Sequence, residues 1–313
     1  MASSLKYQRL VNIHNAKLER YIDVSECNIY HYTSTSACNE ILSHRTLRFT
    51  DRNYLNDYSE GRHVIELCIK SEFENLLPNE YSEYFKNRLQ AFYDNPSKKQ
   101  RLIFQCSFSL DNDNLSLWNY YTKSAGIQGY NLGFNSTELS HNLNTYNESK
   151  HHKLTVFHGK IQYNTEQQKA IVEQIISDFI GIIKEYQSDA KFCKLAIDLM
   201  IEKILFVGSF FKKCCFSHEN EYRLLIHLAP YWDPESKQIK FMVIHKGANT
   251  YEKNGLFVPY LDIEFEKNDL KTISVSPTMN FDETESNIRN VLNIHGFNKD
   301  LVQIVKSDIP VRY

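Results

Sequence analysis

The sequence predicts a protein of the α+β class whose sheet is mainly antiparallel. Segments with strand patterns are scattered among helices of unequal length, without the strand–helix–strand regularity of a doubly wound parallel sheet. Apolar residues at helical spacing over about 165–207 predict an inserted helical hairpin. No linker, repeat or low-complexity tract divides the chain, so we expect an N-terminal helical flank over 1–27 and a single domain over 28–313.

The first third of the chain is predicted to contain one strand and several helices. Ser34 or Ser36 is suited to cap the helix that follows the strand, because a serine hydroxyl accepts a hydrogen bond from a free backbone N–H group. The expected elements are a surface helix (Leu5–Tyr21), a strand (Asn28–Tyr32), a helix ending in Leu47–Thr50, an ordered polar loop (Asn53–Gly61), and helices at about 62–76 and 79–94.

The remaining two thirds are predicted to hold most of the strands. The period-two alternation of Ser217–Leu228 predicts a strand on which Glu219, Glu221 and Arg223 share one face. A polar loop with His141, His151 and His152 is expected to be solvated rather than metal-binding, because no carboxylate or cysteine joins it. The other expected elements are strands at Arg101–Leu110, Gly126–Phe134, Thr155–Tyr163, Lys240–His245, Leu261–Phe265, Lys271–Val275 and Leu301–Val305, and helices at Leu115–Tyr121 and Glu283–His295.

The composition describes a near-neutral globular chain. Thirty-six Lys and Arg residues against 38 Asp and Glu residues give a formal charge of −2, so no global field attracts a polyanion or an anionic membrane. No secretory signal and no run of about 20 apolar residues is present, and we therefore expect a cytoplasmic protein without membrane contact. The seven cysteines lack zinc-site spacing and are expected to be reduced and mostly buried.

Three short motifs contain residues suited to chemistry: Tyr30–Ser34, Leu117–Tyr121 and Glu219–Arg223. Each lies at the end of a predicted strand or in the turn after it. Taken alone, each also has a purely structural interpretation: a half-buried strand histidine, a helix core at i, i+3 spacing, and a solvated sheet face. Their joint occurrence in this order favours a functional interpretation.

The motifs together resemble the bacterial domain-of-unknown-function family 2971, from about Asn28 to the C-terminus. Tyr58 replaces a proline that is usual there, and Phe216 replaces a common tryptophan. This family in turn looks like the ADP-ribosyltransferase superfamily of His-Tyr-Glu type, which implies a split, mainly antiparallel sheet. The stretches that carry the resemblance are His31–Ser34, Leu47–Thr50, Asn56–Glu60, Cys106–Ser109, Leu117–Tyr121 with Gly126, a lysine before Phe216–Arg223, and Ser274–Pro277.

The resemblance implies that NAD is the co-substrate and that the carboxylates act at its reacting ribose. Breaking the nicotinamide–ribose bond develops oxocarbenium character, which a nearby carboxylate stabilises; Glu221 is expected in this role. Glu219 would orient or deprotonate the acceptor nucleophile. Arg223 would balance the two carboxylates. No metal is implied, and Glu221→Gln is expected to remove activity while leaving the fold intact.

The other residues of the resemblance would bind and orient NAD. Tyr120 or Tyr121 would stack on the nicotinamide ring, with Tyr121 favoured by the Trp-x-x-Tyr register. His31, supported by Thr33 or Ser34, would hydrogen-bond the adenosine-side ribose. The full set expected around NAD is His31, Tyr32, Thr33, Ser34, Asn56, Glu60, Trp118, Tyr120, Tyr121 and Arg223.

The sequence leaves the acceptor and two other function classes open. An ADP-ribosyltransferase of this kind would modify a protein or a single-stranded nucleic acid, RNA included, as an intracellular toxin or anti-phage effector with a possible antitoxin partner. A regulatory module would bind a nucleotide or partner without turnover. NAD hydrolysis and metal-assisted nucleic-acid cleavage form the third class, the latter disfavoured because no Asp-Glu-Lys cluster of metal-ligand type is present.

Overall fold

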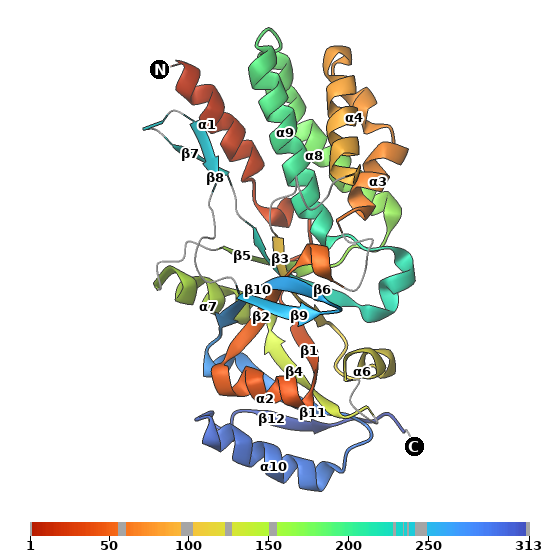
Figure 1. Ribbon diagram of the computed structural model, residues 1–313, viewed down its shortest axis with the longest axis vertical. Coiled ribbons are helices and arrows are strands. Elements are labelled where there is room, and N and C mark those ends of the chain that lie inside the picture. The colour runs from red at the N-terminus through yellow and green to blue at the C-terminus, as the bar shows by residue number, and fades with distance from the viewer. Residues whose placement is uncertain are drawn as a thin grey trace.

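The fold is mixed α+β with a mostly antiparallel sheet, as the sequence predicts (Figure 1). A bundle of helices rises from one side of the sheet, and further helices cover its other parts. No described helix combines the length and the apolar character that a membrane crossing requires. The computed structural model describes residues 2–55, 61–94, 103–122, 127–149, 155–227, 230–233, 235–236, 238–241 and 249–310.

The main sheet consists of a path of eight strands and a side branch of two. Among the strand pairs of the sheet, β11 and β12 are parallel and the others antiparallel. The path runs β12 (Gln303–Lys306), β11 (Leu270–Val275), β4 (Gly129–Asn135), β1 (Asn28–Ser34), β3 (Ile103–Ser109), β2 (Thr46–Asp51), β10 (Leu256–Glu264) and β9 (Asn249–Lys253); the branch is β6 (Glu221–His227) with β5 (Val156–Lys160), and β7 (Pro230–Asp233) pairs with β8 (Gln238–Phe241) as a separate hairpin.

The sheet divides at its central strand, β3. One edge of β3 pairs with β6 over the whole length of both strands. The other edge pairs with β2 at Phe104 and Gln105, and with β1 at Ser109. Between these two contacts, no strand of the described residues pairs with residues 106–108 on that edge. The two halves of the sheet therefore diverge from β3 and leave a gap between β1 and β2.

The helical bundle has its own hydrophobic core. The predicted hairpin is present as α8 (Thr165–Glu185) and α9 (Ala190–Val207), whose N-termini are capped by Asn164 and Asp189. It does not form an isolated insertion, because helices from two earlier segments share its core and Leu225 of β6 joins that core to the sheet. The other members of the bundle are α1 (Ala2–His14), α3 (His63–Lys70) and α4 (Asn79–Asp94), with short 3-10 turns η1 (Leu18–Arg20) and η3 (Phe73–Leu76).

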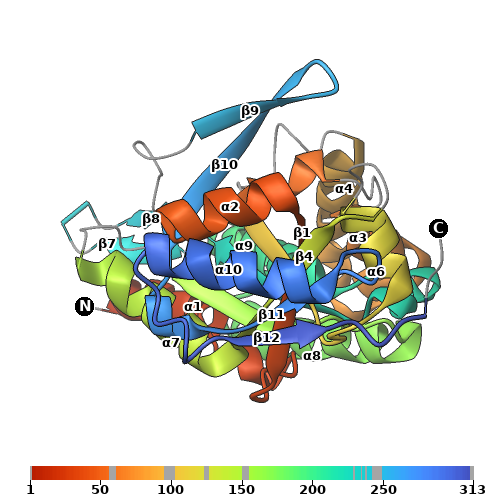
Figure 2. The same cartoon turned by 90° about the horizontal axis from the view of Figure 1, so that it is seen from below.

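A second core lies between the sheet and three other helices: α2 (Thr35–His44), α7 (Ser136–Ser149) and α10 (Phe281–Ile294). Figure 2 shows α2 and α10 side by side across the sheet. Leu42 of α2 and Leu292 of α10 are fully buried there. Ser34 caps α2 through a hydrogen bond from the N–H of Ala37, so the first of the two predicted caps is confirmed.

Several predicted elements are wrong in kind or in extent. The helix expected to end in Leu47–Thr50 ends at His44, because Arg45 adopts a left-handed conformation (φ 54°) and the residues after it pair with β10 as β2. The polar region around His141 is the helix α7, whose buried Leu139 and Leu143 one turn apart were hidden among polar residues. His151 and His152 lie outside the described residues.

The strand expected over Ser217–Leu228 is shorter than predicted. A 3-10 turn, η5 (Cys214–Glu219), occupies its first part, and Asn220 has a left-handed backbone (φ 43°) that ends the alternation. The strand β6 begins only at Glu221. Glu221 and Arg223 therefore share a face, whereas Glu219 reaches the same region from the turn.

Candidate functional site

A cavity of about 660 Å³ lies where the sheet divides. Its volume is typical of small-molecule sites. Residues of strands β1, β2 and β3, of α6 (Leu115–Tyr121) and η5, and of the start of β6 line it. The lining residues are Tyr30, His31, Tyr32, Arg48, Thr50, Leu55, Gln105, Cys106, Ser107, Phe108, Ser109, Leu117, Tyr120, Tyr121, Lys212, Phe216, His218, Glu219 and Glu221.

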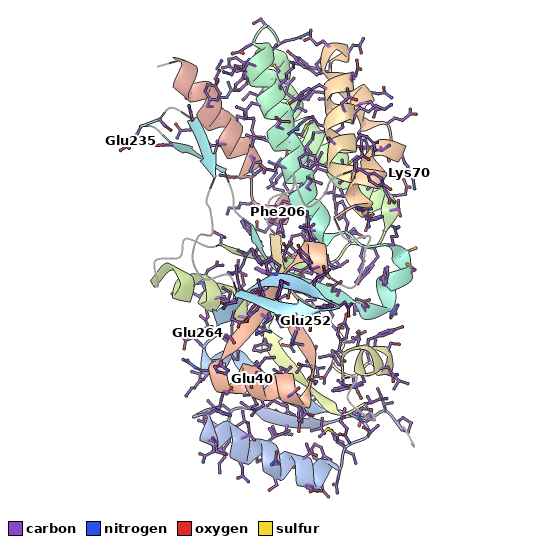
Figure 3. All side chains as sticks on the ribbon, in the orientation of Figure 1. Glu40, Lys70, Phe206, Glu235, Glu252 and Glu264 are labelled. Carbon is purple, nitrogen blue, oxygen red and sulfur yellow. The ribbon has the colours of Figure 1, made fainter. Side chains whose placement is uncertain are left out.

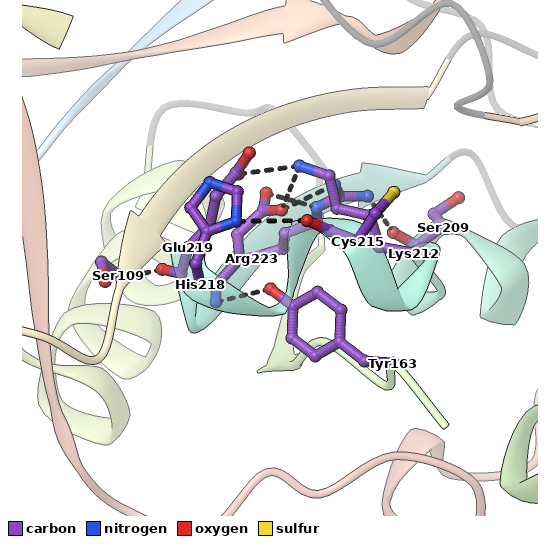
Figure 4. A network of polar contacts seen from close by, with 9 residues as sticks. Ser109, Tyr163, Ser209, Lys212, Cys215, His218, Glu219 and Arg223 are labelled. Carbon is purple, nitrogen blue, oxygen red and sulfur yellow. Dashed lines mark hydrogen bonds and ion pairs between the residues drawn. The ribbon is translucent and has the colours of Figure 1, made fainter. Parts of the chain in front are cut away.

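Glu221 sits at the centre of a buried ion-pair network (Figure 4). The guanidinium of Arg223 donates to both carboxylate oxygens, from Nε at 2.6 Å and from Nη2 at 2.9 Å. Arg223 is only 1% exposed, and its Nη1 donates to the carbonyl oxygen of Ser209. The backbone N–H of Glu221 donates to the hydroxyl of Tyr163. This bidentate pairing fixes the orientation of the Glu221 carboxylate.

Lys212 connects the two carboxylates of the third motif. Its Nζ atom lies 2.8 Å from Oε2 of Glu219 and 3.1 Å from Oε2 of Glu221. The ammonium also lies over the ring of Phe216, 4.8 Å from its centroid. Glu219, Glu221, Lys212 and Arg223 thus form a cluster in which two negative and two positive charges compensate each other.

These positive charges keep Glu221 ionised. Burial by itself would raise the pKa of its carboxyl group, but Arg223 and Lys212, with hydrogen bonds from Arg223 and Ser107, hold the pKa well below its usual range. Glu221 therefore carries its negative charge throughout the physiological pH range.

His31 bridges the gap in the sheet. Its Nδ1 lies 3.0 Å from the carbonyl oxygen of Ser107, on the part of the β3 edge where no described strand pairs. A carbonyl oxygen only accepts, so Nδ1 donates and Nε2 is the acceptor of the neutral ring. Burial lowers the pKa of His31 more than the Ser107 bond raises it, which keeps the ring neutral near pH 7.

The helix α6 places two tyrosines at the cavity. Asn114 caps α6, as predicted for the turn before it, by accepting from the N–H groups of Ser116 and Leu117. Tyr120 and Tyr121 line the cavity while remaining 57% and 43% exposed, so their rings are open to a ligand. The Tyr120 ring also lies 6.2 Å from that of His218.

Several predicted site residues do not line the cavity. Trp118 is fully buried, packs edge-on against Tyr32 and donates from Nε1 to Asp113, so it positions α6 instead. Thr33 is buried, and Ser34 caps α2. Arg223 pairs with Glu221 but is not among the lining residues. Tyr32, in contrast, does line the cavity. Its hydroxyl also donates to the carbonyl of Asp111 and so stabilises the turn before α6. Asn56 and Glu60 lie outside the described residues.

Three further residues line the cavity that were not predicted from the sequence as site residues: Arg48, Ser107 and Lys212. A lysine before the third motif was visible, but its reach to both carboxylates depends on the turn η5. Ser107 faces Arg223 across the β3–β6 pair, and no sequence signal gives that register. Arg48 lies over the ring of Tyr260, 3.9 Å from its centroid, and pairs with Asp262; strand β2, which carries it, was predicted as helix.

A family described as "Protein of unknown function (DUF2971)" matches residues 117–224 of this chain. The matched segment begins at α6 and ends in β6, so it contains Tyr120, Tyr121, Lys212, Glu219 and Glu221. The family similarity expected from the sequence is thus supported over this segment. No curated protein and no solved structure matches the chain.

Proposed function

We propose that this protein cleaves NAD at the nicotinamide–ribose bond and transfers ADP-ribose to a macromolecular acceptor. The main support is the single cavity that His31, the Tyr120–Tyr121 pair and Glu221 share, although they come from distant parts of the sequence. The acceptor would be a protein or a nucleic acid, RNA included, and a toxin or anti-phage role in the cytoplasm would suit that activity.

In this reaction the bond between nicotinamide and C1′ of the ribose breaks, and its electron pair leaves with the nicotinamide nitrogen. Positive charge then develops on the ribose, where the ionised Glu221 would stabilise it. The acceptor nucleophile forms the new bond to C1′, and its proton passes to Glu219 at the side of the cavity or to solvent.

The remaining lining residues supply positioning. An exposed tyrosine of α6 would stack on the nicotinamide ring, which keeps the reacting bond oriented. Nε2 of the neutral His31 would accept a hydrogen bond from a ribose hydroxyl. Lys212 would have to shift toward Glu219 for Glu221 to act on the ribose, because its ammonium now contacts both carboxylates.

One observation favours a second candidate, a module that binds a nucleotide without turnover. Glu221 is 4% exposed, and the positive charges around it compensate its own. A neutral cluster attracts a developing cation less than a lone carboxylate does.

Incubation with NAD distinguishes these functions. We expect nicotinamide release together with attachment of ADP-ribose to lysate protein or RNA, read by mass spectrometry. Release without attachment would indicate NAD hydrolysis, the other enzymatic alternative. NAD binding with no release would indicate the binding module, and absence of both would refute the proposal.

Two single-residue variants then separate the carboxylate roles. Glu221→Gln should lower nicotinamide release by at least about 100-fold, since the lost charge acts in the transition state. Glu219→Gln should lower transfer to the acceptor and leave release in the absence of acceptor largely intact. Equal loss of both readouts in Glu219→Gln would contradict its assignment to the acceptor.

A further inference from the structure

We propose that a second cavity, between the helical bundle and the sheet, binds a small organic carboxylate. This cavity has a volume of about 360 Å³, at the lower end of the range for ligand sites. It is lined from four places: the segment between α1 and β1, helix α7, strand β5 and the end of α9. Phe206, labelled in Figure 3, marks this junction.

The central group of the cavity is the ammonium of Lys203. Lys203 is 3% exposed, and its Nζ donates to the carbonyl oxygen of Ala16 at 2.8 Å. The ammonium also lies 5.2 Å from the ring centroid of Tyr21 and 5.8 Å from that of Phe206. Within the described parts of the chain, no carboxylate lies within salt-bridge distance of it. An ammonium has three N–H donors, and a buried charge requires a compensating partner. We therefore expect an anion to bind beside the ammonium of Lys203.

Two neighbouring residues of the lining can offer further hydrogen-bond donors. Ser140 on α7 is one of them, through its hydroxyl. His158 on β5 lies with Nδ1 2.5 Å from the hydroxyl of Tyr222, which also hydrogen-bonds Ser136. If Ser136 donates to Tyr222 and Tyr222 donates to Nδ1, the Nε2 atom of His158 carries the proton and is a donor.

The lining also decides which anion fits. Lys203 and Lys17 contribute two positive charges and Glu19 one negative charge, while burial lowers the pKa of His158 and keeps its ring neutral near pH 7. One net positive charge suits a monoanion better than a phosphate dianion. Phe157 and Phe206, with ring centroids 4.9 Å apart, form an apolar wall for an organic group.

The test is a calorimetric titration with acetate, butyrate, benzoate and phenylacetate, with inorganic phosphate and the neutral benzamide as comparisons. We expect at least one carboxylate to bind saturably, and benzoate to bind at least tenfold more tightly than benzamide if it is that ligand. Binding of phosphate alone, equal binding of the charged and neutral aromatic probes, or no binding of any carboxylate would overturn the proposal.

Variants locate the binding. Lys203→Met removes the ammonium, retains the length of the side chain, and should weaken carboxylate binding at least tenfold; Lys169→Met, at a surface lysine paired with Glu166, should not change it. Val24→Phe fills part of the cavity without altering Lys203 and should also abolish binding. Unchanged carboxylate affinity in both cavity variants would refute the site. Because neither variant touches the β3 cavity, this outcome is independent of NAD cleavage.

Discussion

At the scale of single residues, the two tyrosines of α6 are the side chains whose substitution tests NAD binding most directly. Both rings are open at the cavity, and stacking of a base-like ring on an aromatic side chain contributes about 1–3 kcal/mol. We expect alanine at the stacking position to weaken NAD binding about tenfold or more, and alanine at the other to change it less than about threefold. Calorimetry on Tyr120→Ala and Tyr121→Ala identifies the stacking residue, with Phe257→Ala, an exposed aromatic outside the cavity lining, as control.

The buried pair of Glu221 and Arg223 alters the expectation that Glu221→Gln leaves the fold intact. Removing one partner of a buried ion pair leaves the other charge uncompensated, which costs about 3–5 kcal/mol. We therefore expect Glu221→Gln to lower the free energy of unfolding by about 3 kcal/mol, and Glu219→Gln by less than about 1 kcal/mol, because Lys212 retains Glu221 as a partner.

Urea denaturation of both variants measures this difference. Equal stability of the two variants would show that the Arg223 pair is not the main stabilising contact of Glu221. Activity of Glu221→Gln must accordingly be assayed where circular dichroism shows the variant to be folded.

At the scale of elements, the cap of α6 connects helix stability to ligand binding. Replacing Asn114 with alanine removes the acceptor for two backbone N–H groups, and loss of such a cap costs about 1 kcal/mol. We expect Asn114→Ala to lower stability by this amount and also to weaken NAD binding, because α6 positions both tyrosines.

Asn164→Ala is the matched control, since the Asn164 side chain caps α8 by accepting from the N–H of Gln167 and does not line the cavity. It should reduce stability comparably, as measured by thermal unfolding, and leave NAD affinity unchanged. Equal loss of NAD affinity in both variants would argue against a local role for α6.

The elements also show what the sequence could and could not predict. Periodicity gave the α8–α9 hairpin, and cap chemistry gave Ser34 and the turn before α6. The left-handed Asn220 was not predictable, because asparagine tolerates this conformation without requiring it. Helix α7 was missed because few of its residues are apolar.

The candidate site was only partly predictable from the sequence. Short motifs identified several of its side chains, and the structure places His31, Tyr120, Tyr121, Glu219 and Glu221 at one cavity. Contacts across strands, such as those of Lys212 and Ser107, depend on register and turn geometry that no local pattern encodes. The catalytic and binding roles remain predictions.

At the scale of the whole molecule, Lys203 makes the stability of the folded protein depend on pH. Burial lowers its pKa from 10.5 to about 8, although Asp178 and Glu19 act in the opposite direction. A folded-state pKa below that of the unfolded chain means that the folded protein binds fewer protons between these values, so Lys203 makes stability rise from about pH 8 to 10.5.

Lys203→Met lacks this dependence. We expect it to be more stable than the unaltered protein at pH 7, and the difference to shrink by roughly 3 kcal/mol as the pH rises to 10.5. Urea unfolding of both proteins at pH 7 and pH 10.5 gives the comparison, in which the titration of all other groups cancels. A difference independent of pH would mean that Lys203 is not buried as an ammonium.

The division of the sheet at β3 also has a consequence for biosynthesis. Strand β3 receives one neighbour, β1, from the beginning of the chain, and another, β6, from residues made much later. While β6 has not yet been synthesised, one edge of β3 has no strand to pair with, and the nascent chain lacks Glu219 and Glu221. The cavity at β3 can therefore first assemble only after most of the polypeptide has been translated, and until then the nascent chain lacks a complete site.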